Sequence, residues 1–269
     1  MTINDQLVRA YLDSESMEKY RDEWLFHALE TGKNVFEYPA QSAQMAKNVE
    51  MLWRAFEEAA RDFQPVNVAI WDALFPNWPS IPVHIDLIVG FPKPYDAVTM
   101  KDAAGHTHIV LDLIRWCDYG MPKDAEGVVR NLLAHEMTHA FIAARCPEAD
   151  AAADGKDYRP KLDGLTFHEG FAHLIAYENR RIDQVKWDSD FWRQIEETSR
   201  SKMRVAVAET DPEKQKKHLR NGFCGRYEEK YACMSGMLYL VKQWQKNGLD
   251  GLKASFADYH GFAGKTIEM

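Results

Sequence analysis

The sequence predicts an α+β fold that is mostly helical, with a small sheet ahead of a helix that carries two histidines. Helical periodicity comes first, two strand-like segments follow, and helical periodicity then returns and continues toward the end of the chain. This order differs from the regular alternation of strands and helices in a parallel α/β sheet. Outside the histidine helix, the segments expected to be helical are 5–30, 41–62, 164–181, 187–208 and 226–247.

The N-terminal part is expected to form a helical region, residues 1–64. Apolar side chains recur at helical spacing between residues 41 and 62, namely Met45, Val49, Leu52, Trp53, Phe56 and Ala60. Four prolines between residues 64 and 82 then interrupt any regular element. Residues 65–269 are expected to hold the catalytic region with a helical C-terminal lobe, either as a second domain or continuous with the first.

Two strands are expected just before the histidine helix. Residues 83–89 alternate and are rich in β-branched side chains, and residues 108–114 show a second apolar stretch. A segment with Gly, Pro and Asp separates them, which suits a small sheet. The strand at 108–114 is expected to lie at a cleft edge, where an extended peptide could add to it as a further strand.

Composition excludes several functional classes. With 46% hydrophobic and 28% charged residues among 269, the chain resembles an ordinary globular protein, and no apolar run reaches the ~20 residues of a membrane span. A net charge of −8 argues against nucleic-acid binding. The first residues lack the pattern of a secretory signal, so a cytoplasmic location is expected. The basic run at 214–220 is expected to be a solvated helix face. Four cysteines without C-x-x-C spacing are expected to be core or free thiols; they are Cys117, Cys146, Cys224 and Cys233.

Residues 135–139 read His-Glu-Met-Thr-His, the H-E-x-x-H spacing. On a helix, His135 and His139 lie on one face about one turn apart, so both imidazoles can reach one metal ion. Glu136 lies beside them and would be the general base for a water molecule activated by the metal, as in metalloproteases. The alternative is a pair of core histidines satisfied by hydrogen bonds.

The surrounding sequence supplies the helix that this motif requires. Asp124 can cap its start and Pro147 marks its end. The apolar stripe consists of Val128, Val129, Leu132, Leu133, Met137, Ala140, Phe141 and Ala144. The following stretch through Asp163 is either a functional loop over a site or contains a short helix.

A catalytic zinc site uses three protein ligands, so a third is expected downstream. Ile142 and Arg145 stand where the metzincin pattern needs Gly and His, which excludes that pattern. Residues 165–174, Leu-Thr-Phe-His-Glu-Gly-Phe-Ala-His-Leu, open another expected helix. Together, the two motifs resemble those of the gluzincins, zinc metallopeptidases of clan MA with a zincin-like fold. The resemblance covers residues 128–178 and, more loosely, the region from Gly236 to Gly248.

The gluzincin resemblance implies one zinc ion per chain, held by His135, His139 and Glu169, with Glu136 as the base. It also implies a Tyr or His from the C-terminal helices as the donor to the oxyanion, for which Tyr227, Tyr231, Tyr239 and His218 are the candidates. Tyr231 is more readily explained as a packed aromatic, because its register to Gly236 differs by two from the family pattern.

The chain also departs from the gluzincin pattern. Thirty positions separate His139 from Glu169, and no G-x-M-E-N element precedes the motif, so aminopeptidase activity is not implied. His173 stands where thermolysin-like members have an Asp that orients a ligand histidine. Two alternatives to the Glu169 ligand stay open: a capping box with Thr166, and a three-histidine site that uses His173 instead. His168 and His173 cannot both share the face of Glu169.

The sequence therefore predicts a zinc-dependent hydrolase that cuts peptide bonds within unstructured peptides or proteins. A zinc-stabilised binding or regulatory protein without turnover is one alternative, and a hydrolase of a non-peptide amide is another. No nucleic acid or membrane partner is expected, and the oligomeric state is not predicted.

Overall fold

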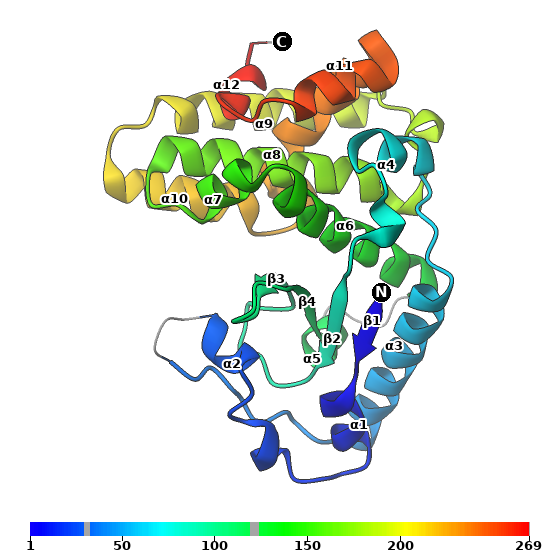
Figure 1. Cartoon of the computed structure of the whole chain (residues 1–269). Helices are drawn as coiled ribbons and strands as arrows, with labels where there is room; N and C mark the ends of the chain where they lie inside the picture. Colours follow the sequence, from blue (N-terminus) through cyan, green and yellow to red (C-terminus); the bar gives the residue numbers. More distant parts are fainter. Residues whose placement is uncertain (30–32, 119–123, 269) are drawn as a thin grey trace. The chain divides into compact units, whose positions relative to one another are not determined.

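The computed structural model describes residues 1–29, 33–118 and 124–268, and it has the predicted α+β character: mostly helices, with one small sheet (Figure 1). The chain divides into two compact units. The first unit comprises Met1–Gln64 and Pro79–Ala140, and the second comprises Pro65–Trp78 and Phe141–Met269. No helix in the described ranges is both long enough and apolar enough to cross a lipid bilayer.

The sheet of the first unit has four strands in the order β1-β2-β4-β3. Parallel pairing joins β1, β2 and β4, whereas β3 runs antiparallel to β4. The two inner strands are largely buried, which explains their continuous apolar character. The bounds are β1 Thr2–Asn4, β2 His84–Ile88, β3 Ala97–Lys101 and β4 Thr107–Asp112.

This order corrects the expectation that the strand at 108–114 lies at an edge. β4 pairs with β2 on one side and with β3 on the other, so neither of its edges can accept a peptide. The outer strand on that side of the described sheet is β3. The prediction located the two inner strands but omitted β1, which has three residues, and β3, which is not buried.

The strand at 108–114 also ends earlier than expected. It stops at Asp112, which caps a short helix, α5 (Leu113–Cys117). The Asp112 carboxylate accepts hydrogen bonds from the backbone N–H groups of Ile114 and Arg115 and from those of Gly90 and Phe91, the last two at 2.7 Å. Burial raises the pKa of Asp112 to about 6 against the opposing effect of these bonds, so the carboxylate is ionised at neutral pH.

The N-terminal helices of the first unit are shorter than predicted. The segment expected to be one helix at 5–30 is broken, as far as it is described, and Ser14 has a positive φ of 56° that a helix cannot accommodate. The helix expected at 41–62 is confirmed as α3, and the Ser42 hydroxyl accepts a hydrogen bond from the Met45 N–H at its start. The elements are α1 Gln6–Leu12, η1 Met17–Tyr20, α2 Leu25–Ala28 and α3 Ala43–Arg61.

Helices make up the second unit, in which α8 packs against α7, α11 and α12, and α9 packs against α11. Between the two units along the chain lies η2, Trp78–Ser80. The α-helices are α4 Val68–Leu74, α7 Pro147–Asp154, α8 Tyr158–Ala176, α9 Asp190–Ala208, α10 Pro212–Phe223, α11 Tyr231–Phe256 and α12 Phe262–Lys265. The short 3-10 turns are η3 Tyr177–Asn179, η4 Ile182–Gln184 and η5 Tyr227–Glu229.

Several boundaries in this unit differ from the prediction. The proline-rich stretch does contain a helix, α4, because its seven residues fit between Pro65 and Pro76. The stretch after Pro147 contains the short helix α7, with Pro147 in its first turn. The basic run at 214–220 lies on a helix, α10, as expected; Lys214, Lys216, Lys217 and Arg220 are exposed, whereas His218 is half-buried. All four cysteines are free thiols.

Two glycines bring α8 and α11 into backbone contact. A Cβ atom on Gly170 would lie 2.9 Å from the Cα atom of Gly236, and one on Gly236 would lie 2.6 Å from the carbonyl oxygen of Thr166. No real Cβ approaches backbone that closely, so only glycine fits at both positions. The crossing of α8 and α11 is therefore fixed one residue away from Glu169.

Candidate functional site

The H-E-x-x-H residues lie on α6, Ala125–Arg145, in the part that belongs to the first unit. The helix begins where predicted, because the Asp124 carboxylate accepts a hydrogen bond of 2.9 Å from the Gly127 N–H. It ends at Arg145, two residues before Pro147. The motif therefore lies in the middle of a long helix.

His135 and His139 direct the same ring atom toward one point. Their Nε2 atoms are 3.1 Å apart, and their rings are inclined at 80° with centroids separated by 4.8 Å. Two nitrogens bound to one tetrahedral zinc ion at about 2.0–2.1 Å would be separated by roughly 3.3 Å. The pair thus has the spacing of two metal ligands, and the same distance allows an N–H···N hydrogen bond between the rings; both side chains are only partly buried.

A side chain from the sheet contacts Glu136. Its side chain is buried, and the Thr99 hydroxyl on β3 donates a hydrogen bond of 3.0 Å to its Oε2 atom. A hydroxyl donor of this kind fixes the orientation of an acceptor carboxylate. Thr99 was missed by the sequence reasoning, although the β-branched pair Val98 and Thr99 was a signal for a strand here.

Glu169 and His173 lie on α8 in the second unit. His173 Nδ1 is 2.9 Å from the backbone oxygen of Glu169 and 3.2 Å from its Oε2 atom. The thiol of Cys233 on α11 donates to the same Oε2 atom at 3.8 Å. His173 is buried, whereas about a quarter of the Glu169 side chain, 23%, is exposed. The two residues share one helix face, as their spacing predicted.

The capping-box explanation for Glu169 is wrong. α8 begins at Tyr158 with Asp157 at its N-cap position, so Thr166 lies well inside the helix. The Thr166 hydroxyl instead donates to the carbonyl oxygen of Leu162 at 2.6 Å. His168 is buried beside Phe167, with ring centroids 6.2 Å apart. No requirement of the helix start therefore explains Glu169.

The four candidate oxyanion donors have different surroundings. Tyr231 is buried among apolar side chains and its hydroxyl donates to the backbone oxygen of His218, which confirms it as a packed aromatic. Tyr239 packs on Phe262. Tyr227 lies next to His173, with ring centroids 5.1 Å apart. Although 37% of Tyr227 is exposed, desolvation raises its pKa above the ordinary value of 10, so the phenol keeps the proton that a donor needs.

The structure thus contains two groups of potential metal ligands: a histidine pair with a buried glutamate on α6, and a carboxylate with a histidine on α8. Imidazole nitrogens and carboxylate oxygens are typical zinc ligands. Comparison with protein-family models, curated protein sequences and solved structures yields no match for this chain.

Proposed function

We propose that this protein is a zinc-dependent peptidase with a zincin-like fold, in which His135, His139 and Glu169 hold the metal and Glu136 is the general base. The main observation in favour is the pair of Nε2 atoms 3.1 Å apart on α6, with a buried glutamate at the position between them in the motif. A pair of histidines in an apolar core would not require that glutamate.

Zinc fits this donor set better than a hard cation does. Two imidazoles and one carboxylate form a common catalytic zinc set, whereas magnesium and calcium prefer oxygen ligands only. A bound zinc ion would supply a Lewis acid that lowers the pKa of water toward about 7 and polarises the substrate carbonyl.

Glu136 performs the proton transfers in this proposal. Its carboxylate accepts the proton of the attacking water and passes it to the leaving amine, which must be protonated to depart. Thr99 donates to only one carboxylate oxygen in the contact described, at 3.0 Å. That bond would hold the carboxylate in place without removing its capacity to accept a proton.

His173 would act on Glu169 and not on the substrate. Its Nδ1 atom contacts both the backbone and the carboxylate of Glu169, and it is buried. Such contacts orient a metal-binding carboxylate. Tyr227, beside His173 and protonated, is our choice among the four candidates for the oxyanion donor.

The peptide substrate would add to β3 and not to β4. β3 is one of the two outer strands of the described sheet, and its Thr99 contacts the base. An extended peptide paired with β3 would gain backbone hydrogen bonds along its length, which favours cuts within a chain over removal of single terminal residues.

Metal analysis tests the ligand set. We expect about one zinc per chain in the purified wild type, and a content well below one in His139→Ala and in Glu169→Ala, because each change removes one of three protein ligands. His260→Ala is the matched control, since His260 is an exposed histidine whose side chain is 75% accessible. Elemental analysis after reconstitution and dialysis gives the ratio.

The same measurement separates the alternatives. If His173→Ala loses the metal and Glu169→Ala keeps it, the three-histidine site replaces the proposed one. If replacement of His135 or of His139 by alanine leaves the zinc content unchanged, the proposed metal site is wrong.

A further inference from the structure

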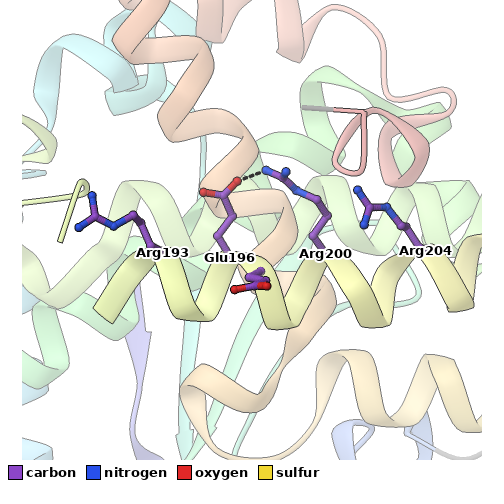
Figure 2. A pocket seen from close by; sticks show the side chains of 5 residues that line it. Arg193, Glu196, Arg200 and Arg204 are labelled. Carbon is purple, nitrogen blue, oxygen red and sulfur yellow. Dashed lines mark hydrogen bonds and ion pairs between the residues drawn. The ribbon is translucent and has the colours of Figure 1, made fainter. Parts of the chain in front are cut away.

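A row of charged side chains follows one face of α9 in the second unit. Arg193, Glu196, Arg200 and Arg204 are spaced by three or four residues, which places them along one side of the helix (Figure 2). Together with Glu197 they line a hollow of about 180 Å³. The hollow is therefore bordered by three guanidinium groups in a chain whose net charge is −8.

The cations here outnumber the carboxylates. Arg193 has its own partner in Asp190, but Arg200 and Lys242 of α11 both bind the same Oε1 atom of Glu196. Apart from the Arg193–Asp190 pair, the cluster has three cations and two carboxylates. The cations are Arg200, Arg204 and Lys242, and the carboxylates are those of Glu196 and Glu197. The site keeps a positive charge that its own side chains do not cancel.

The charges are close enough to disfavour one another. Burial, followed by the charge of Arg204, lowers the pKa of Arg200, and burial, followed by the charge of Arg200, lowers the pKa of Lys242. Burial and the neighbouring cation thus oppose each charge, while the shared ion pairs with Glu196 favour both. A bound anion would offset this repulsion.

One buried donor also needs an acceptor. The Nε atom of Arg200 is shielded from solvent and has no hydrogen-bond partner within the described structure. A buried N–H without an acceptor costs free energy, so the Arg200 guanidinium would gain by turning this donor toward a ligand oxygen in the hollow. This observation is independent of the charge count and concerns the same side chain.

We propose that this hollow binds a phosphate group, with Arg200 and Arg204 of its lining as the cationic contacts; Lys242 adds positive charge through its pairing with the lining residue Glu196. A space of about 180 Å³ corresponds to roughly six water molecules at ~30 Å³ each, which is room for a tetrahedral oxyanion and some solvent. Guanidinium groups bind phosphate through paired N–H donors. A phosphate dianion offers more charge and more acceptor oxygens than a carboxylate.

Glu196 is a built-in competitor for this phosphate, since it already occupies Arg200 and Lys242. Removing its charge should tighten phosphate binding, whereas removing Arg200 should weaken it. A purely structural role of the cluster would not produce opposite signs for the two changes.

Calorimetric titration with inorganic phosphate at constant ionic strength tests this proposal. We expect Arg200→Gln to weaken binding by about 10- to 100-fold, the equivalent of one or two charge-assisted hydrogen bonds, and Glu196→Gln to strengthen it. Acetate should bind more weakly than phosphate. Lys202→Gln is the matched control: it removes a cation from the same helix, at an exposed position that does not line this hollow.

Two further titrations identify the source of the phosphate and test whether phosphate binds at the proposed zinc site instead. Glycerol phosphate that binds at least as well as inorganic phosphate indicates a phosphate ester as ligand, and weaker binding indicates the free ion. The affinities should be equal before and after removal of zinc by a chelator. Absence of phosphate binding to folded wild type, weaker binding by Glu196→Gln, or an equal loss in Lys202→Gln would overturn the proposal.

Discussion

Glu136→Gln is expected to lower peptide hydrolysis by about 10²- to 10⁴-fold while the zinc content and the fold stay unchanged. The amide has the shape of the carboxylate and can still accept the hydrogen bond from Thr99 through its oxygen. It cannot accept the proton of the attacking water, however. The loss should therefore appear in kcat, with little change in metal binding.

Mass spectrometry of a digested peptide library measures this loss and also locates the cuts. Glu126→Gln is the control, because it makes the same chemical change in the first turn of the same helix, where Glu126 pairs with Arg130. Stepwise trimming from amino termini would contradict the endopeptidase proposal. Zinc-loaded wild type that cuts no peptide, or Glu136→Gln that cuts equally well, would favour a zinc-stabilised binding protein.

Gly236→Ala is expected to destabilise the protein by about 3 kcal/mol, the upper end of the range for overpacking. The new methyl group would meet the carbonyl oxygen of Thr166 at 2.6 Å and the Cα atom of Gly170 at 2.9 Å. These are backbone atoms, which cannot rotate away, so the two helices must separate. The higher helix propensity of alanine offsets only about 1 kcal/mol of this cost.

Urea unfolding followed by circular dichroism gives the free energy of unfolding for this variant. Gly264→Ala is the matched control, since a Cβ atom there would have nothing within 4 Å and its φ is not positive. We expect that change to be neutral or slightly stabilising. Equal stability of Gly236→Ala and wild type would show that α8 and α11 do not pack as closely as described.

Long periodic segments were predictable from the sequence, because burial of one face leaves a repeating apolar pattern. This holds for α3, α6 and the two inner strands of the sheet. β1, with three residues, is too short to show a pattern, and β3 is only half-buried along its length, so it lacks the buried apolar run of β2 and β4. α10 was expected only as a basic helix face at 214–220, although Asp211, which caps it, and Pro212 in its first turn also mark where it begins.

The candidate site was predictable to the extent that its residues are close in sequence. The face shared by His135 and His139, and that shared by Glu169 and His173, follow from a spacing of four on a helix. Thr99 stands 37 positions from Glu136, and only the pairing of strands brings it there. The start of α8 was misplaced because Thr166 and Glu169 have the sequence pattern of a capping box, whereas the helix begins at Tyr158 with Asp157 in the N-cap position and no side-chain cap hydrogen bond.

The glycine contact between α8 and α11 affects how strongly Glu169 could bind a ligand. Side chains at a helix crossing can usually shift among rotamers, but Gly170 and Gly236 have none to shift. Glu169 therefore stands next to a point that is fixed by backbone alone. Its backbone is ordered when the protein folds and His173 contacts its carboxylate, so a ligand of Glu169 would find that group already oriented and would lose less entropy in ordering it.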